Sequence, residues 1–168
     1  MRKSSKKSVL FDASKCVGCF ACSVACMDQH DIDIQREGVM LRRVVDVERC
    51  DADEVEIAHV SLACMHCEDA ACIDACPARA LVRDVATGAV IVRHERCIGC
   101  HACAMACPFG VPRFGADGTM LKCDECYART MFGLNPACVD ICPGGALTFE
   151  DPNDAMARKQ LRSACSLL

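Results

Sequence analysis

Cysteine is the residue type in this chain that offers the clearest chemistry. The sequence has 168 residues and 18 cysteines, a content that indicates either metal sites or a disulfide scaffold. Sixteen of the cysteines fall into four groups, which we number one to four in chain order. The groups are Cys16, Cys19, Cys22 and Cys26; Cys64, Cys67, Cys72 and Cys76; Cys97, Cys100, Cys103 and Cys107; and Cys123, Cys126, Cys138 and Cys142.

The spacing within the groups distinguishes between the possible metals. Groups one and three have the spacing C-x2-C-x2-C-x3-C, and a proline directly follows the last cysteine of groups two, three and four. This run is typical of bacterial ferredoxins, in which three cysteines surround one [4Fe-4S] cluster and the fourth binds the neighbouring cluster. A structural zinc site does not need a third cysteine after two residues, and disulfides are rare in a reducing compartment. The spacing therefore favours iron–sulfur clusters.

Composition and charge exclude several other classes of protein. The chain has no Trp and one Tyr, so we expect something other than hydrocarbon to fill part of its interior. The net charge of -4 gives no reason to expect nucleic-acid binding. No run approaches the roughly 20 apolar residues of a membrane span, and the basic start at residues 1–8 leads into no apolar stretch. These observations predict a cytoplasmic metalloprotein.

The four groups form two pairs, which sets the expected number of clusters. Groups two and three are joined by two expected strands, at residues 80–83 and 89–93, around a Thr87-Gly88 turn. Groups one and four are flanked by expected strands at 8–12 and 145–150. Because the fourth cysteine of a run binds the other cluster of its pair, four [4Fe-4S] clusters are predicted. The ligand sets are Cys16, Cys19, Cys22 and Cys142 for cluster 1; Cys64, Cys67, Cys72 and Cys107 for cluster 2; Cys97, Cys100, Cys103 and Cys76 for cluster 3; and Cys123, Cys126, Cys138 and Cys26 for cluster 4.

The expected fold class is α+β, with two fused two-cluster ferredoxin units of the bacterial type built from short hairpins and short helices. An inserted hairpin is expected from strands at 39–47 and 54–62, and Asp151-Pro152 is expected to begin a C-terminal helix through Cys165. Neither of these two segments carries recognisable chemistry. The predicted domains are an outer unit at 1–38 and 109–150, an inner unit at 60–108, the hairpin at 39–59 and the helix or tail at 151–168.

Other residues near the cysteines have ordinary interpretations. His66 and His101 could hydrogen-bond a cluster sulfur, but as ligands they are redundant. Cys50 and Cys165 fall outside every group and are expected to be free thiols. The basic residues that precede three groups are expected to be solvated, with the competing hypothesis that a cation raises the potential of the nearby cluster. These basic residues are Lys15, Arg96 and Lys122.

The cysteine pattern also resembles a known family. Over about residues 8–150, the chain is similar to the iron–sulfur electron-transfer subunits that accompany molybdopterin enzymes of the dimethyl sulfoxide reductase and formate dehydrogenase type, and to the small ferredoxin-like subunit of tungsten aldehyde oxidoreductases. Some relatives replace one cysteine of group three with Trp and hold a [3Fe-4S] cluster, whereas all four are present here. The most specific stretches are 16–26, 97–113, 122–126 and 133–143.

The resemblance implies an electron-transfer subunit of anaerobic metabolism that has no catalytic residues of its own. It would relay electrons between a catalytic subunit with a molybdenum or tungsten pterin and a second redox partner, such as a flavin/NAD or hydrogenase subunit. The alternative is a stand-alone polyferredoxin or a hydrogenase-linked electron wire. Relatives with membrane partners often have a long C-terminal extension, and only 26 residues follow Cys142, so direct membrane insertion is not expected. Some relatives cross the membrane folded with a signal-bearing partner, so the resemblance leaves export open.

Overall fold

Short strands and short helices make up most of the protein. The computed structural model describes residues 6–51 and 54–165, with side chains described over 6–50 and 55–160. The strands form four two-stranded antiparallel sheets, and the class is α+β as predicted. The sheets are β1 (Ser8–Phe11) with β8 (Leu147–Glu150), β2 (Arg43–Asp51) with β3 (Glu54–Leu62), β4 (Leu81–Arg83) with β5 (Val90–Val92), and β6 (Arg113–Phe114) with β7 (Met120–Leu121).

The helices follow the cysteine loops and are mostly one or two turns long. The loops of groups one and three have the same local structure, because each begins after a 3-10 turn and continues into a helix. The residues that precede these helices, Phe20 and His101, both have left-handed backbone angles, with φ of 61° and 62°. The helices are η1 (Ala13–Lys15), α1 (Ala21–Gln29), α2 (Ile34–Glu37), α3 (Ala71–Asp74), η2 (His94–Arg96), α4 (Ala102–Ala106), α5 (Tyr127–Met131), α6 (Ala137–Asp140) and α7 (Pro152–Cys165).

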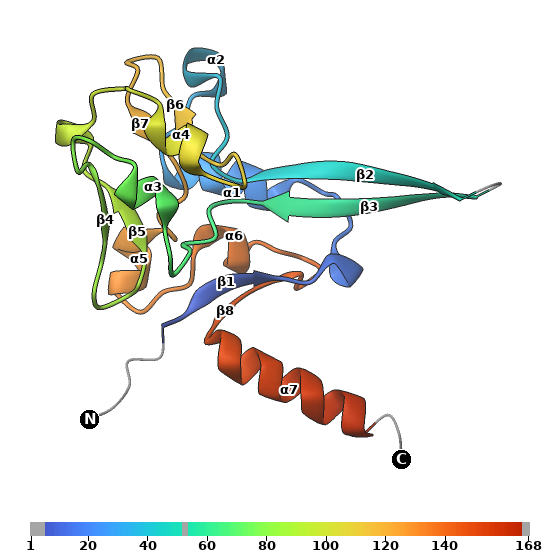
Figure 1. Cartoon of the computed structure of the whole chain (residues 1–168). Coiled ribbons are helices and arrows are strands. Elements are labelled where there is room, and N and C mark those ends of the chain that lie inside the picture. Colours follow the sequence, from blue (N-terminus) through green and yellow to red (C-terminus); the bar gives the residue numbers. More distant parts are fainter. Residues whose placement is uncertain (1–5, 52–53, 166–168) are drawn as a thin grey trace.

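Pairing between distant strands brings the cysteine groups together. Strand β1 pairs with β8 in a register that places Ser8 opposite Glu150, so group one lies beside group four although more than 90 residues separate them. Helix α1 packs against α6, and α3 packs against α4. Strands β4 and β5 lie in the other part of the molecule, together with α3 and α4 (Figure 1).

Two small cores, found among the described residues, hold these parts together. One contains Ala70, Leu81, Val90 and Met120 around Cys103. The other contains Val44 and Leu147 around two cysteines, Cys22 and Cys138. Each core mixes hydrocarbon with cysteine side chains, as expected for a chain whose interior holds something besides apolar residues.

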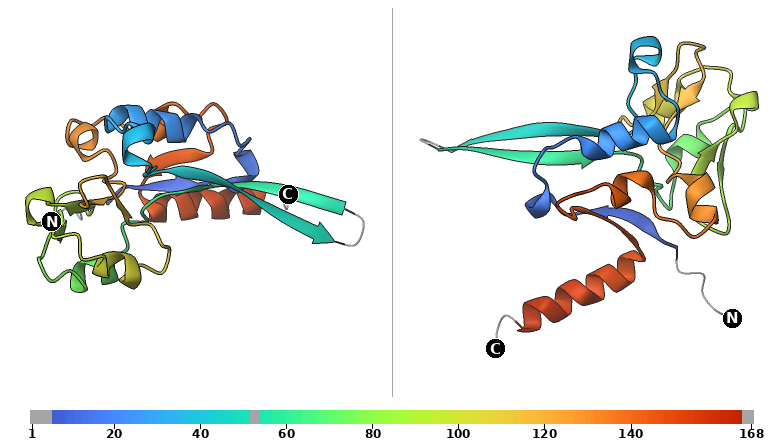
Figure 2. Two further views of the ribbon diagram at one scale, coloured as in Figure 1. Left: turned by 90° about the horizontal axis from the view of Figure 1, so that it is seen from above. Right: turned by 180° about the vertical axis from the view of Figure 1, so that it is seen from behind.

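Two elements extend away from the cysteine-bearing part of the molecule. The β2–β3 hairpin projects as a long arm in all three views, and α7 leads away after β8 (Figures 1 and 2). The Asn153 amide donates to the Asp151 side chain at 2.8 Å, so α7 begins at Pro152 as predicted. Among the helices of residues 6–51 and 54–165, none is both long enough and apolar enough to cross a lipid bilayer.

The structure corrects some of the expected boundaries. The first strand of the inserted hairpin is β2 at Arg43–Asp51, four residues later than predicted, because Leu41 and Arg42 are buried before the arm begins. Strand β3 has the predicted bounds. The β6–β7 hairpin was not expected, although its Asp117-Gly118 turn is a common hairpin signal. Residues 52 and 53, between the two strands of the inserted hairpin, lie outside the described residues, as does the Cys165 side chain.

Candidate iron–sulfur sites

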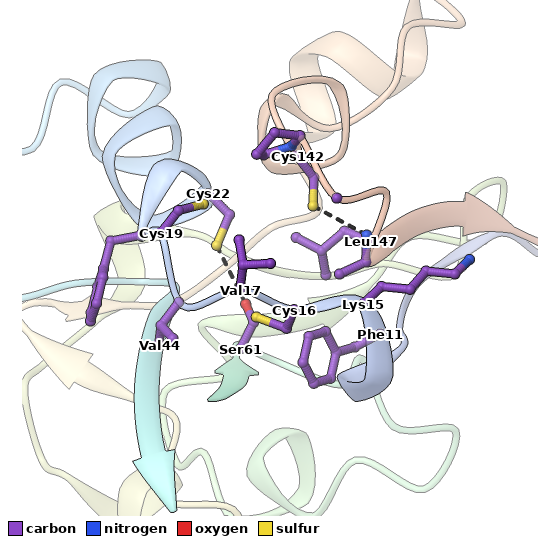
Figure 3. A pocket seen from close by; sticks show the side chains of 14 residues that line it. Phe11, Lys15, Cys16, Val17, Cys19, Cys22, Val44, Ser61, Cys142 and Leu147 are labelled. Carbon is purple, nitrogen blue, oxygen red and sulfur yellow. Dashed lines mark hydrogen bonds between the residues drawn. The ribbon is translucent and has the colours of Figure 1, made fainter. Parts of the chain in front are cut away.

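The cysteines predicted for cluster 1 line one cavity. Cys16 ends η1, Cys19 lies in the following loop, Cys22 is in the first turn of α1, and Cys142 follows α6. Figure 3 shows these side chains around a common space, with Phe11, Val44 and Leu147 nearby. The apolar neighbours exclude water from one side of the cavity, while Cys19 is exposed.

The cysteines predicted for cluster 3 line a second, similar cavity. Cys97, Cys100 and Cys103 come from the group three loop and α4, and Cys76 follows α3. Leu81, Val92, Phe114 and Met120 complete the wall. Cys100 is exposed, as Cys19 is in the first cavity. The two cavities thus share one kind of lining, a C-x2-C-x2-C loop with one cysteine from another group.

The cysteines predicted for cluster 4 are all buried and close enough to influence one another. Burial, together with the charges of the nearby Cys138 and Cys126, raises the pKa of the Cys26 thiol to about 12. Burial and the charge of Cys138 raise the pKa of Cys126 to about 11. The pKa of Cys123 is raised by burial too, with Cys26 among its neighbours. Protein alone disfavours thiolates here, whereas a metal would deprotonate the thiols outright.

The cysteines predicted for cluster 2 surround a half-buried site. Burial raises the pKa of Cys72, with Cys64 and Cys107 raising it further and the charge of Lys122 acting in the opposite direction. The loop that carries Cys67 is fixed by Arg83, whose guanidinium donates to the backbone carbonyls of residues 66–68 and of Gly88. The structure therefore brings three of the four thiols together and fixes the loop of the fourth.

Backbone amides donate to the cysteine sulfurs in a repeated pattern. In groups two and four, the first cysteine accepts from the amide two residues later, and the last accepts from the amide four residues later. These bonds favour the thiolate over the thiol. They are His66 to Cys64 at 3.5 Å, Glu125 to Cys123 at 3.4 Å, Ala80 to Cys76 at 3.2 Å and Ala146 to Cys142 at 3.2 Å. Group three has a further bond, from Met120 to Cys97 at 3.3 Å.

The inserted hairpin contributes to the site, which was not expected from the sequence. Arg42 is 4% exposed, and its guanidinium donates to the Ser61 hydroxyl at 3.0 Å. The same hydroxyl lies 3.6 Å from the Cys22 sulfur (Figure 3). The segment was expected to carry no recognisable chemistry, and the structure adds that its base is folded into the cysteine-rich interior.

The three basic residues before the cysteine groups do not behave alike. Lys15 and Arg96 are exposed, as expected. Lys122 is only 5% exposed, and its ammonium donates to the carbonyls of Val90 and Cys123. The expectation of a solvated side chain is wrong for Lys122, because β5 and the group four loop cover it.

Three histidines and Cys50 have distinct environments. Burial lowers the pKa of His66 to about 2, helped by the charges of Lys122 and Arg83, so its ring is neutral. The ring of His101 stacks on Phe114 with centroids 3.7 Å apart. Cys50 is free and exposed on β2, outside the four sets. His30 was not singled out from the sequence, yet its Nε2 lies 4.0 Å from the Cys126 sulfur.

The donor set fits iron–sulfur clusters. Each predicted set supplies four thiols, all of them free, which is the ligand number of a [4Fe-4S] cube. Several buried polar atoms among the described side chains have no hydrogen-bond partner within the protein. These are Arg42 Nε, His66 Nε2 and Ser23 Oγ. A buried donor normally has an acceptor, and the sulfides and thiolates of a cluster are acceptors.

Comparison with known proteins gives an independent view of the cysteine pattern. The sequence profile of the 4Fe-4S dicluster domain matches residues 55–152, which contain groups two, three and four. The B subunit of the anaerobic dimethyl sulfoxide reductase of Haemophilus influenzae is 39% identical over 159 residues, covering 89% of this chain and 75% of that protein. The formate dehydrogenase-O iron-sulfur subunit of Escherichia coli K12 is 36% identical over 156 residues, covering 83% of this chain and 51% of that protein.

Proposed function

The chain belongs to the 4Fe-4S dicluster family, as an iron–sulfur electron-transfer subunit of the dimethyl sulfoxide reductase and formate dehydrogenase type, and from this premise we propose that it relays electrons through four [4Fe-4S] clusters. Its role is electron transfer rather than catalysis. Each cluster, when bound, supplies one-electron redox chemistry; the chain holds the clusters at fixed places and sets their surroundings. The proposed ligands are the four crossed cysteine sets defined above.

The observation that carries this proposal is the convergence of distant cysteines. Cys142 lies with the group one loop, and Cys76 lies with the group three loop, as the crossed pairing requires. A zinc site would bring two local C-x2-C pairs together instead. The paired packing of α1 with α6 and of α3 with α4 supports two ferredoxin units, an outer one at 1–38 and 109–150 and an inner one at 60–108, with the insertion at 39–59 between them.

Buried charges shared between the cysteine sets suggest the order of the four sites. Arg42 influences thiols of the first and fourth sets, and Lys122 influences Cys123 of the fourth set and Cys72 of the second. Cys76 of the third set follows α3, the helix that carries Cys72. The proposed order is therefore first, fourth, second, third, with exposed Cys19 and Cys100 at the two ends.

We propose that the two ends serve two partners. One end faces a catalytic subunit with a molybdenum or tungsten pterin, and the other faces a second redox protein. An electron leaves a partner, passes along the row, and reaches the other partner without any bond being made or broken in this chain. The names of the similar proteins, reductase and dehydrogenase subunits, support a catalytic partner of this kind.

Metal analysis of the protein isolated without oxygen from its host, with whatever binds it, tests this function. We expect roughly 16 Fe per chain from four cubanes, and molybdenum or tungsten in the bound partner. About eight Fe would contradict the four-cluster proposal, and zinc in place of iron would contradict the cluster chemistry. Sixteen Fe without molybdenum or tungsten would instead favour the stand-alone ferredoxin.

A pair of cysteine variants tests the ligand assignment. Cys142→Ser should remove a ligand from cluster 1 and reduce the iron to between about 12 and 15 atoms per chain, because the cluster is lost or becomes [3Fe-4S]. Cys50→Ser is the matched control, since Cys50 is free, exposed and outside every set. An unchanged iron content and unchanged spectra in Cys142→Ser would refute its assignment as a ligand.

A further inference from the structure

We propose that Arg42 is a shared cation that tunes two adjacent cluster sites: its guanidinium acts on the fourth site directly and on the first site through the hydroxyl of Ser61. This inference rests on the four-cluster function proposed above. Arg42 is buried and carries no electron itself, so it tunes the clusters by its charge and its hydrogen bonds.

The position of Arg42 is the first observation behind this inference. It lies at the base of the inserted hairpin, just before β2, and is 4% exposed, while its neighbour Arg43 is exposed. A buried arginine is uncommon unless anions surround it. No carboxylate lies within 4 Å of Arg42 among the ion pairs of the described side chains. Its charge must therefore be balanced by other groups.

Cysteine sulfurs supply that balance. Burial acts to lower the pKa of Arg42, but the charges of four nearby cysteine sulfurs, once ionised as cluster ligands are, outweigh the burial and the pKa is raised. Three of these cysteines belong to the fourth set and one to the first. They are Cys138, Cys123 and Cys26 for the fourth set, and Cys22 for the first. The Arg42 side chain in turn acts to lower the pKa of the Cys138 thiol, against the burial that raises it.

The route to the first site passes through Ser61. The guanidinium Nη1 donates to the Ser61 hydroxyl at 3.0 Å, and the hydroxyl lies 3.6 Å from the Cys22 sulfur. With Arg42 as its donor, the hydroxyl has its own proton free to donate to the Cys22 thiolate. This arrangement strengthens the hydrogen bond to sulfur, because a charged donor polarises the hydroxyl. Figure 3 shows the Ser61 side chain directed at the Cys22 sulfur, with the interaction drawn as a dashed line.

One nitrogen of Arg42 remains available for a further acceptor. Its Nε is buried and has no hydrogen-bond partner within the described protein. An unpaired, charged N–H in the interior is costly, so a partner is expected in the assembled molecule. The sulfide of a cluster in the fourth site is an acceptor of suitable chemistry, because three cysteines of that set are near enough to act on the charge of the guanidinium.

The consequence is electrostatic. Reduction adds one electron to a cluster and leaves its ligands unchanged, so a fixed positive charge nearby favours the reduced form and raises the potential. A unit charge several ångströms away, at an effective dielectric constant of about 20, changes the reduction equilibrium by about tenfold or more. An electron passing between the first and fourth sites stays within the field of the same cation, so Arg42 favours reduction on both sides of the step.

Redox titration of the complete complex, followed by electron paramagnetic resonance, tests this inference. In Arg42→Met, reduction should become about tenfold less favourable at one cluster, which lowers its potential by about 59 mV for one electron, and a second potential should fall by less. The other two potentials should not change. Arg42→Lys keeps the charge and should largely restore both. Arg43→Met, the exposed neighbour, should leave all four potentials at their wild-type values.

Ser61→Ala separates the two branches and keeps the test decisive if Arg42→Met binds less iron. It removes the hydroxyl and retains the cation, so reduction of one cluster should become a few-fold less favourable and the potential of that cluster should fall. This cluster should be the one whose potential falls by the smaller amount in Arg42→Met. Full iron with four unchanged potentials in both variants would overturn the role of Arg42. An iron content of about eight in the wild type would instead refute the four-cluster function on which the inference rests.

Discussion

Gly144 offers a direct test of how the two distant halves of the first cavity are held together. It follows Pro143, just beyond Cys142, and a Cβ at this position would lie 2.6 Å from the backbone carbonyl oxygen of Lys15. Lys15 immediately precedes Cys16. Ordinary contacts begin at 3.4 Å, so the two backbone segments would have to separate by about 0.8 Å, the difference between 3.4 and 2.6 Å. Gly144→Ala should therefore push Cys16 and Cys142 apart.

The size of the effect follows from this clash. Overpacking against backbone costs about 1–3 kcal/mol, which for a chain of this length lowers the melting temperature by about 2–12 °C. We expect Gly144→Ala to melt lower by an amount in this range and to lose iron from one cluster, taking the content from about 16 toward about 12 per chain. Anaerobic thermal melting and iron analysis measure the two effects.

Gly115→Ala is the matched control. Its added Cβ would also be crowded, at 2.7 Å, but by the carboxylate end of Glu37, a flexible side chain that can rotate away. The hydrogen bond from the Ala116 amide to that carboxylate would be lost, at a cost of about 1 kcal/mol, and the stiffer unfolded chain offsets about 0.4–1 kcal/mol. We expect its melting temperature and iron to stay close to wild type. If Gly144→Ala matched Gly115→Ala, the proposed close contact between the two cysteine loops would be refuted.

Three further predictions concern the core, the group four loop and the clusters. Met120→Ala should lower the free energy of unfolding by about 2–5 kcal/mol, measured by anaerobic melting, because Met120 is 1% exposed in the inner core. Met105 is 87% exposed, so Met105→Ala should change the free energy of unfolding by less than about 0.5 kcal/mol. Arg129 donates to the Asn135 carbonyl and to Asp140 at 2.8 Å and so fixes the loop between Cys126 and Cys138. Arg129→Met should therefore lower the free energy of unfolding by about 1–3 kcal/mol and reduce the retention of iron. Iron retention equal to wild type would show that the loop is held by other contacts. Removing iron with a chelator should lower the melting temperature by more than any of these substitutions, because each cluster would join cysteines of different groups, such as Cys142 and the group one loop, and an apoprotein as stable as the loaded form would contradict this.

Local cysteine spacing and short apolar runs were sufficient to predict much of the fold. A run of three cysteines two residues apart must wrap one loop around a common centre, so the loops before α1 and α4 were predictable from the residues themselves. The β1–β8 and β4–β5 pairs also agree with the strands expected beside the cysteine groups, because short apolar runs lie there. The start of α7 followed from Asp151-Pro152, a local capping signal.

Boundaries that depend on packing were less predictable. Residues 39–42 have an apolar pattern that resembles a strand, yet Leu41 and Arg42 turn into the interior and β2 begins only at Arg43. The pattern could not reveal this, because whether an alternating segment pairs with its neighbour or packs into a core depends on what lies beside it. The β6–β7 hairpin is only two residues long on each side, too short for a periodic signal.

The sequence by itself determined which cysteines belong to which loop, since ligand spacing is a local property of the backbone. Only the tertiary structure decided the electrostatics of the sites. Lys122 looks like any surface lysine until the Val90 carbonyl, 32 residues away, accepts from it. Arg42 becomes a buried cation because Ser61 and the cysteines of two groups surround it. Burial of a charge depends on which distant segments cover it, and only the assembled chain specifies that.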